Sequence, residues 1–352
     1  MRSLGEDWHP ARAWGRPGAG GRIRVRPGDF RVDEWLGFEA SGDGPHVLLR
    51  VEKTGCNTVE VARALAAHAG ARTREVGYCG LKDKHASCLQ WFSVPHAPGI
   101  EWQAFTHPGV RVLECRRHRR KLRRGAHRAN RFVIRVVLDG FDGGDLDGRL
   151  QRVRSEGVPN YFGEQRFGLR YTENAAALAV GGRLPRPQRS MTLSAIRSDL
   201  FNRVLDERVR RGTWNIALPG EYVNLDGTRS GFAAPDDDPA IADRVAAMDL
   251  HPTAPLYGSG PSPASGEAAR VEEEVMQGFE AWRELLVRHG LKMERRATRC
   301  AVRDLEWRLE EDEGILQLAF TLGRGRFATA VLREVVDYRD VTREPEHGRT
   351  GM

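Results

Sequence analysis

The sequence predicts an α+β fold with a mixed or largely antiparallel sheet. The first and last parts of the chain are expected to share that sheet, with an α-rich module inserted between them. Three observations support this prediction. Alternating apolar residues, which are typical of strands, recur between residues 22 and 138. Apolar residues spaced three and four apart, which are typical of helices, dominate from about 190 to 289. Alternation returns at 305–322, and strands that pair need not be neighbours in sequence.

The first part of the chain predicts a small antiparallel sheet followed by a helix. Residues 1–20 are rich in Gly, Pro and Arg and are expected to be a poorly ordered lead. Residues 23–25, 30–36 and 46–51 then alternate like strands, separated by Pro-Gly-Asp and Ser-Gly-Asp-Gly-Pro turn signals. From Asn57 or Thr58 the apolar spacing becomes that of a helix, which we expect to end at Gly70.

The stretch at 77–94, GYCGLKDKHASCLQWFSV, contains a single carboxylate, Asp83, between Lys82 and Lys84. It follows a glycine-bearing loop and precedes residues 88–94, which alternate like a largely buried strand. A loop fixed by a strand is a common support for a reactive side chain. The alternative is a lysine-rich surface turn in which the aspartate is incidental.

Residues 115–131, CRRHRRKLRRGAHRANR, form the most positively charged segment, with nine Arg or Lys and no acidic residue. Because like charges repel, such a concentration points to contacts with phosphates, which release counterions. The alternative is a solvated basic loop without a partner. The segment leads into a predicted strand at 131–138, which joins it to the sheet.

The middle of the chain is predicted to be mostly helical. After a predicted helix at 146–155, the run VPNYFGEQRFG at 158–168 combines aromatic, amide and glycine residues. Such a turn can stack on bases and hydrogen-bond their edges, or it can brace a junction between domains. One long helix is then expected to end near Gly212 and another to span 267–289.

The last part of the chain returns to strands. Residues 305–309 and 315–322 are predicted strands that flank an acidic turn. A final helix is expected at 327–338. These strands resemble the early ones in length and alternation, which is why we expect both sets to belong to one sheet.

Composition indicates a folded protein with a polyanionic partner. The 352 residues carry a formal net charge of +7, mostly through arginine, which forms bidentate contacts with phosphate. A general bias towards Arg and Ala would also produce this charge. The five cysteines are odd in number and scattered, which argues against a disulfide framework and for the cytoplasm. Neither a signal-like apolar region nor a run of membrane-spanning length occurs, so no membrane association is expected.

Three competing chemical motifs are rejected. Residues 323–328, GRGRFA, match a dinucleotide-binding pattern, but too few residues follow to complete the βαβ unit. Cys79, His85 and Cys88 match no usual zinc spacing and lack a fourth ligand. Cys79 is better explained as a small core residue at a strand end than as a nucleophile. We therefore expect neither a cofactor nor a metal.

Five motifs, in order along nearly the whole chain, closely resemble the TruD family of tRNA pseudouridine synthases. They are GYCGLKDKHASCLQWFSV, HRANRFVIRV, VPNYFGEQRFG, HPTAPLYG and GRGRFATAVLREV. The resemblance implies a pseudouridine synthase catalytic domain made of 21–154 plus 301–352, with a TRUD-type domain at 155–300 inserted in it. The sequence departs from the family in its long amino-terminal lead and at Ala254, where a glycine is expected before the Pro.

The resemblance also implies the reaction, a cofactor-free isomerisation of uridine to pseudouridine at position 13 of tRNA. Asp83 matches the family's catalytic aspartate, acting as nucleophile or as the base that removes a ribose proton. The target nucleotide must be flipped out of the folded tRNA to be reached. Phe30, Asn130 and Phe327 match family positions that contact it. By residue type alone, the two phenylalanines could be core residues and Asn130 a turn cap.

We expect a monomer that binds tRNA and needs no other protein. Lys82 and Lys84 are expected either to stabilise ionised Asp83 or to contact RNA phosphates. The other predicted RNA contacts are the basic side chains of Arg116, Arg117, Arg119, Arg120, Lys121, Arg123, Arg124 and Arg131. Two alternatives stay open. One is a non-catalytic RNA-binding or tRNA-folding protein on the same scaffold, and the other is a synthase of the same class that acts on another RNA.

Overall fold

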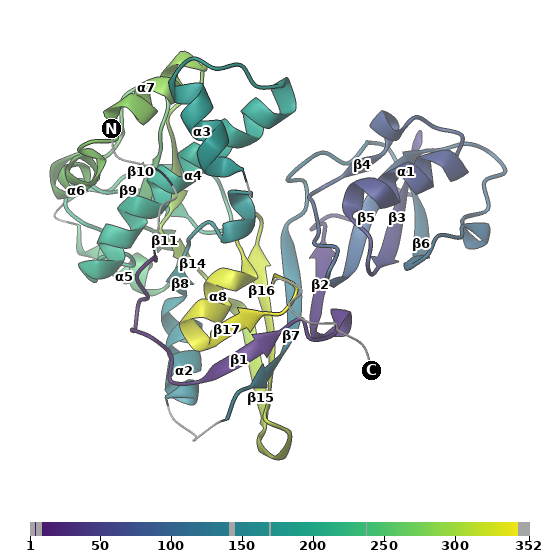
Figure 1. Cartoon of the computed structure of the whole chain (residues 1–352), viewed down its shortest axis with the longest axis horizontal. Helices are drawn as coiled ribbons and strands as arrows, with labels where there is room; N and C mark the ends of the chain where they lie inside the picture. The colour runs from purple at the N-terminus through teal and green to yellow at the C-terminus, as the bar shows by residue number, and fades with distance from the viewer. Residues whose placement is uncertain (1–3, 5–8, 141–144, 169, 237, 344–352) are drawn as a thin grey trace. The chain divides into compact units, whose positions relative to one another are not determined.

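The computed structural model describes residues 4, 9–140, 145–168, 170–236 and 238–343. The chain forms two compact units (Figure 1). Unit 1 comprises residues 1–17, 147–301 and 326–335, and unit 2 comprises residues 18–146, 302–325 and 336–352. Unit 2 contains a mixed sheet and unit 1 is rich in helices, so the predicted α+β fold is confirmed. The assignment of a catalytic domain and an inserted TRUD-type domain stays a prediction.

Unit 2 is built on one large sheet. Its strands are β1 (Gly20–Ile23), β2 (Phe30–Trp35), β3 (His46–Lys53), β4 (Gly77–Tyr78), β5 (Ser87–Pro95), β6 (Val110–His118), β7 (Ala129–Leu138), β15 (Arg303–Glu310), β16 (Ile315–Gly323) and β17 (Asp337–Asp340). The main order is β15-β16-β7-β2-β5-β3-β6. Early and late strands therefore do share a sheet, through the antiparallel pairing of β16 with β7.

Two parallel pairings make this sheet mixed. β2 runs parallel to β5, which places the start of β5 beside Arg31 and Val32. β1 runs parallel to β17 and also pairs with β7 in the antiparallel sense. The second of these pairings joins residues more than 300 positions apart, so it closes the sheet only after the whole chain has been made.

Helix α1 (Thr58–His68) covers one face of β3 and β5 (Figure 1). It begins where the Asn57 side chain accepts a hydrogen bond of 2.9 Å from the Glu60 amide, the usual arrangement of a helix cap. The apolar residues spaced along one side of the helix are fully buried against Leu49 and Phe92. This packing fixes the sheet beneath the loop that carries Asp83.

The remaining elements belong to unit 1, apart from Leu146 at the start of α2. The helices are α2 (Leu146–Glu156), α3 (Tyr171–Ala179), α4 (Arg186–Arg210), α5 (Pro239–Ala246), α6 (Gly266–Met276), α7 (Glu280–Arg288) and α8 (Ala328–Val335). The strands are β8 (Val158–Pro159), β9 (Tyr222–Leu225), β10 (Gly231–Ala233), β11 (Leu250–His251), β12 (Thr253–Leu256), β13 (Glu294–Ala297) and β14 (Arg299–Cys300). The core lies along α4, whose Leu200, Phe201 and Val204 are fully buried.

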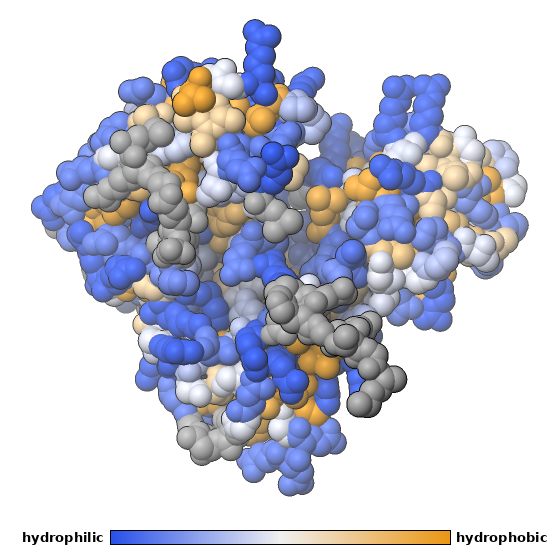
Figure 2. All heavy atoms as spheres, in the orientation of Figure 1, coloured by the Kyte–Doolittle hydropathy of each residue, from blue (hydrophilic) through white to orange (hydrophobic). Residues whose placement is uncertain are grey.

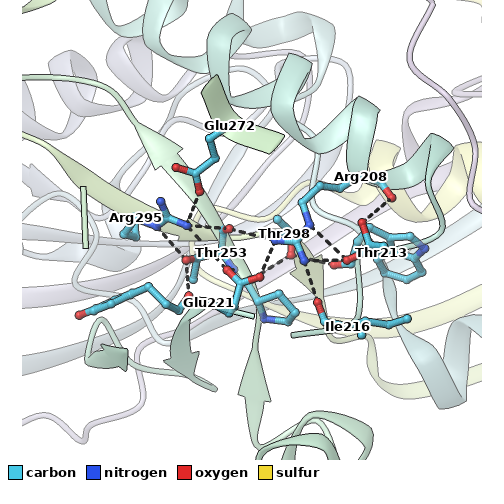
Figure 3. Close-up of polar contacts among 12 residues, drawn as sticks. Arg208, Thr213, Ile216, Glu221, Thr253, Glu272, Arg295 and Thr298 are labelled. Atoms are coloured by element: carbon cyan, nitrogen blue, oxygen red, sulfur yellow. Dashed lines mark hydrogen bonds and ion pairs between the residues drawn. The ribbon is translucent and has the colours of Figure 1, made fainter. Parts of the chain in front are cut away.

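A buried ion-pair network ties the helices of unit 1 to its strands (Figure 3). Arg208 of α4 lies 2.6 Å from Glu221, and Arg295 of β13 lies 2.7 Å from Glu272 of α6. Arg208 also donates to the carbonyl oxygens of Thr213 and Ile216, at 2.8 and 2.7 Å. The network replaces the water that these charged groups lose on burial, so it belongs to the folded core.

Two predicted helices differ in the structure, and one strand was not predicted. The helix expected at 267–289 is two helices, α6 and α7, because Gly278 adopts a φ of +88°, which does not fit a helix. The last helix is α8 alone, and the residues after it form β17, which pairs with β1. The strand β6 was not predicted, because its charged residues hide the alternation.

The described part of the amino-terminal stretch is packed, which differs from the expectation of a poorly ordered lead. Residues 1–3 and 5–8 lie outside the described residues. Trp14 contacts Trp214 edge-on, with ring centroids 6.3 Å apart. Arg149 donates to the carbonyl oxygens of Trp14 and Arg16, at 2.9 and 3.0 Å. Gly- and Pro-rich sequence is thus held by side chains that come from elsewhere in unit 1.

The visible face in Figure 2 is mostly hydrophilic, with hydrophobic residues scattered between. None of the helices in the described part of the chain has the combined length and hydrophobicity that crossing a membrane requires. The five cysteines are all free, and Cys115 is the one that is exposed.

Candidate active site

Asp83 lies on the loop between β4 and β5, with its backbone fixed and its carboxylate accessible. The side chain is 41% exposed, and Oδ1 accepts a hydrogen bond of 3.0 Å from the His85 amide. The Asp83 carbonyl oxygen accepts one of 2.8 Å from Lys53 Nζ. Lys53 is fully buried, and this burial lowers the pKa of its ammonium group. The buried Lys53 side chain therefore fixes the backbone of the loop, while the Asp83 carboxylate is accessible to solvent.

Arg24 is the ion-pair partner of Asp83. Its Nη2 lies 3.0 Å from Asp83 Oδ2, and its side chain is only 8% exposed. Arg24 also pairs with Asp340 of β17. It follows β1 directly and has a φ of +58°, a conformation that is uncommon for residues other than glycine. The sequence interpretation missed Arg24, because nothing near it in sequence signals a partner 59 positions away.

The Phe30 ring contacts Arg24, the ion-pair partner of Asp83. The guanidinium carbon lies 4.2 Å from the centroid of the Phe30 ring, which is a cation–π contact. The ring is 4% exposed and meets Phe132 edge-on at 6.2 Å. Phe30 and Asp83 therefore contact the same Arg24 side chain. The Phe30 ring is nevertheless buried, as expected of a core residue.

Lys82 does not pair with Asp83. Its ammonium group lies 2.7 Å from Glu34 and also donates to the Asn130 side-chain oxygen. Glu34 and Asn130 are only 1% and 7% exposed, and they face each other across β2 and β7. His127 is buried nearby, and burial together with the charge of Lys82 lowers its pKa. Asp83 and Asn130 are thus connected through the side chain of a residue next to Asp83 in sequence.

Phe327 and Lys84 have fewer contacts. Phe327 belongs to unit 1, where its half-buried ring lies 6.0 Å from Phe162, whereas Asp83 belongs to unit 2. Its contact with the target nucleotide stays a prediction. Lys84 is exposed, and its carbonyl oxygen accepts a hydrogen bond of 3.0 Å from Gly55.

The basic segment at 115–131 runs from the end of β6, through a loop, to the start of β7. Several of its side chains already have partners. Arg116 pairs with Glu114, and Arg119 pairs with Asp43 at 2.8 Å. Arg131 lies 3.4 Å from Glu306, at the weak limit of an ion pair. Arg117 donates to the Gly44 carbonyl oxygen, Lys121 donates to that of Arg74, and Arg124 lies 4.2 Å above the Tyr78 ring.

Arg120 and Arg123 differ from these neighbours. Both are exposed, and within the described residues neither has an ion pair with a carboxylate. An arginine without a carboxylate partner can contact a phosphate without first breaking an ion pair, so the only cost is the partial loss of its hydration. These two arginines are therefore the members of the segment best prepared for an RNA contact.

The arrangement at Asp83 suits nucleophilic or base chemistry on a neutral substrate. One exposed carboxylate is fixed by an arginine and a backbone amide, the same arginine contacts the buried Phe30 ring, and the neighbouring Lys82 contacts the buried Asn130 amide. Within the described residues, no cluster of three or more His, Cys, Asp or Glu is arranged to hold a metal ion.

Comparisons with known proteins agree on one family. The chain matches the family model for tRNA pseudouridine synthase D (TruD) at residues 10–180 and 170–335. It is 44% identical over 330 residues to the tRNA pseudouridine synthase D of Nitrosococcus oceani, covering 92% of each chain. It is also 44% identical over 335 residues to that of Methylococcus capsulatus, covering 93% of this chain and 94% of the relative.

A solved structure agrees in fold. The putative tRNA pseudouridine synthase D (TruD) from Methanosarcina mazei superposes with a TM-score of 0.72 at 20% identity. The superposition covers 93% of this chain and 95% of the other. At that identity the likeness concerns the fold alone.

Proposed function

The chain belongs to the tRNA pseudouridine synthase D (TruD) family, and we propose that Asp83 carries out the family's reaction on uridine 13 of tRNA. The protein is an enzyme, an isomerase that converts uridine to pseudouridine in tRNA. The predictions of family, enzyme class and reaction are confirmed. The roles of individual residues and the position of the target uridine are our proposal.

In this reaction the bond between N1 and the ribose C1′ breaks, a bond from C5 to C1′ forms, and the C5 proton is replaced by a proton on N1. No atom is added and no electron is lost, so one carboxylate can serve. Asp83 either attacks the nucleotide or removes a ribose proton. The supporting observation is that its carboxylate is 41% exposed while its ion-pair partner Arg24 is 8% exposed.

The surroundings of Asp83 support the same proposal. The Arg24 guanidinium lies against one carboxylate oxygen, so it fixes the side chain without covering it. Phe30 and Asn130 of unit 2 would contact the flipped-out base. For Phe327 the proposal of a substrate contact rests on the family resemblance alone. The domain that carries the reaction would be residues 21–154 plus 301–352, with residues 155–300 as the inserted TRUD-type domain.

An assay on an unmodified tRNA transcript tests reaction and residue together. The wild-type enzyme is expected to form pseudouridine at position 13, and Asp83→Asn is expected to form it at least about 1,000-fold more slowly. Asp139→Asn is the matched control, because Asp139 is a 32%-exposed aspartate of unit 2 that pairs with Arg339 at 2.8 Å. Turnover by Asp83→Asn at the wild-type rate would exclude our assignment.

A second transcript tests the target position. With cytidine in place of uridine 13, the wild-type enzyme should form no pseudouridine in that transcript. Pseudouridine mapping in cellular RNA with and without the gene extends the test to other RNAs. Loss of pseudouridine only at a site outside tRNA would refute the proposed substrate.

The basic segment would hold the tRNA body. Arg120, Arg123 and Lys84 would contact phosphates directly, since they are exposed and pair with no carboxylate among the residues that the structure describes. The other predicted contacts would exchange a protein partner for a phosphate, as Arg119 would exchange Asp43. Lys82 would have the weakest claim to an RNA contact, because its side chain is 8% exposed and paired with Glu34.

Salt dependence of binding tests this surface. Each phosphate contact contributes a slope of about 0.7 to 0.9 in log K against log salt concentration. Arg120→Gln/Arg123→Gln should therefore lower the slope by about 1.4 to 1.8. Arg270→Gln/Arg283→Gln, which removes two arginines paired within unit 1, is the control and should leave the slope unchanged. An equal effect of both pairs would mean that only net charge matters.

We further propose that the enzyme acts as a monomer in the cytoplasm, without an obligatory protein partner. The free state of all five cysteines, four of them buried, fits a reducing compartment. Light scattering on the purified protein should give the mass of one chain, and that preparation should be active on the transcript. A dimer mass, or a need for a cell extract, would contradict this proposal.

A further inference from the structure

Lys82 connects two buried residues that face each other across the sheet. Glu34 and Asn130 are directly opposite in the antiparallel pairing of β2 with β7, so their side chains lie on one face. The Lys82 ammonium group lies 2.7 Å from Glu34 Oε2 and donates to Asn130 Oδ1. The side chain of Lys82 thus contacts both the Glu34 carboxylate and the Asn130 amide group.

This contact fixes which way the Asn130 amide points. An ammonium group only donates hydrogen bonds, so the atom that faces it must be the carbonyl oxygen. The reverse orientation would place the amide NH2 against a cation. Within the described residues, Asn130 Nδ2 donates to no other group. Its two hydrogens therefore have no acceptor among the described protein groups and can be donated to a ligand.

Lys82 and Glu34 are themselves held in place. Glu34 Oε1 accepts a hydrogen bond of 3.2 Å from the Trp91 amide. The Lys82 amide donates to Thr58 Oγ1 at 2.9 Å, and Gln90 Nε2 donates to the Gly80 carbonyl oxygen at 2.9 Å. Both ends of the ion pair are thus attached to β5 or α1. The Glu34 side chain cannot turn away without breaking its hydrogen bond from the Trp91 amide, and the backbone from which Lys82 extends is fixed.

We propose that Lys82 and Glu34 are positioning residues that orient Asn130 so that its NH2 group donates to a carbonyl oxygen of the target uracil. This inference rests on the proposed function, because it takes Asn130 as a contact of the flipped-out base. Uracil has such oxygens at positions 2 and 4. Cytosine carries an amino group at position 4, which cannot accept this hydrogen bond. Orientation at position 4 would therefore favour uridine over cytidine.

A mutant cycle on the tRNA transcript tests the proposal. Asn130→Ala and Lys82→Met should each lower kcat/KM by about 10- to 100-fold, the effect expected for losing one hydrogen bond or the residue that orients it. Because Lys82 acts through Asn130, the double variant should match Asn130→Ala within about twofold. Lys82→Met leaves Glu34 buried without a partner, so the cycle is repeated with Glu34→Gln/Lys82→Met. Lys292→Met, at an exposed lysine of unit 1, is the control.

Thio-substituted transcripts supply a readout that a merely structural role would not change. Sulfur accepts hydrogen bonds poorly, so the wild-type enzyme should slow on 2-thiouridine or on 4-thiouridine at the target, depending on which oxygen Asn130 contacts. That sensitivity should disappear in both Asn130→Ala and Lys82→Met. Its retention in Lys82→Met, or a further tenfold loss on adding Lys82→Met to Asn130→Ala, would overturn the inference. If the wild-type enzyme formed no pseudouridine in the unmodified transcript, that result would instead refute the proposed function.

Discussion

The site at Asp83 and the network at Arg208 use the same kinds of ion pair but differ in exposure. In unit 1, Arg208 and Glu221 are 2% and 0% exposed, and further buried partners complete the network. In unit 2, Arg24 is as buried as a core residue, yet Asp83 is 41% exposed. An ion pair in which both charged groups are buried has no surface to offer a substrate, so its role is confined to the fold. One left open on the carboxylate side can also meet a substrate.

Unpairing the closed network should have the largest effect on stability. Glu221→Gln leaves Arg208 as a buried cation without its anion and should cost about 3 to 5 kcal/mol of unfolding free energy. Urea unfolding followed by tryptophan fluorescence measures this loss. Glu273→Gln is the control, because Glu273 is 67% exposed and its pair with Arg283 should contribute about 0.5 kcal/mol or less. Equal losses in the two variants would remove the distinction between closed and open pairs.

Removing Arg24, the ion-pair partner of Asp83, should reduce turnover. Arg24→Gln removes the group that holds Asp83 Oδ2 and should lower kcat by about 100-fold, as expected for a displaced reactive group. Arg22→Gln is the control two residues earlier in β1, since Arg22 is 43% exposed and pairs with Asp139 instead. Steady-state kinetics on the transcript measure both variants. An equal kcat for Arg24→Gln and wild type would show that Asp83 needs no partner.

Acidification should weaken unit 1 through His251. This residue is 1% exposed and lies 2.8 Å from Asp226, and burial lowers its pKa below the ordinary value of 6.5. The unfolded chain therefore binds the proton more readily, so stability falls as the pH drops below about 6.5. The slope for one group is at most about 1.4 kcal/mol per pH unit. His251→Asn should flatten the pH dependence of the urea midpoint, and an unchanged slope would contradict this explanation.

Thiol reactivity gives the smallest expected effect and compares the two units directly. Burial raises the pKa of Cys79 to about 12, and Cys88 and Cys300 are at most 1% exposed. Alkylation of the native protein at pH 8 should therefore label Cys115 alone. Mass spectrometry of the labelled peptides checks this. Rapid labelling of Cys79 would show that the loop carrying Asp83 opens.

The prediction of unit 2 succeeded where local pattern decides the outcome. Alternation located β2, β3, β5, β7 and β16 within a few residues, because each packs one face into the core. The loop of Asp83 was found in the same way, as a glycine-bearing segment before a buried strand. The family resemblance supplied the reaction, which no pattern of residues could give.

Pairings over long distances could not be predicted. Arg24 meets Asp83 because β1, paired with β17, ends beside the loop, and no signal near Arg24 indicates this. Lys82 was expected either beside Asp83 or at an RNA phosphate, but neighbouring residues in an extended segment point in different directions. It therefore reaches Glu34 instead. The buried network of unit 1 was not anticipated, since Arg208 and Arg295 read as ordinary surface residues in sequence.

The most direct test of the open carboxylate is a single-turnover measurement on Asp83→Asn, with enzyme in excess over the tRNA transcript. We predict that the rate of pseudouridine formation falls by about 1,000-fold or more. The urea midpoint and the affinity for tRNA should match those of the wild type, because the closed network of unit 1 is untouched. A rate near that of the wild type, or a loss of rate explained by unfolding, would contradict the role we assign to Asp83.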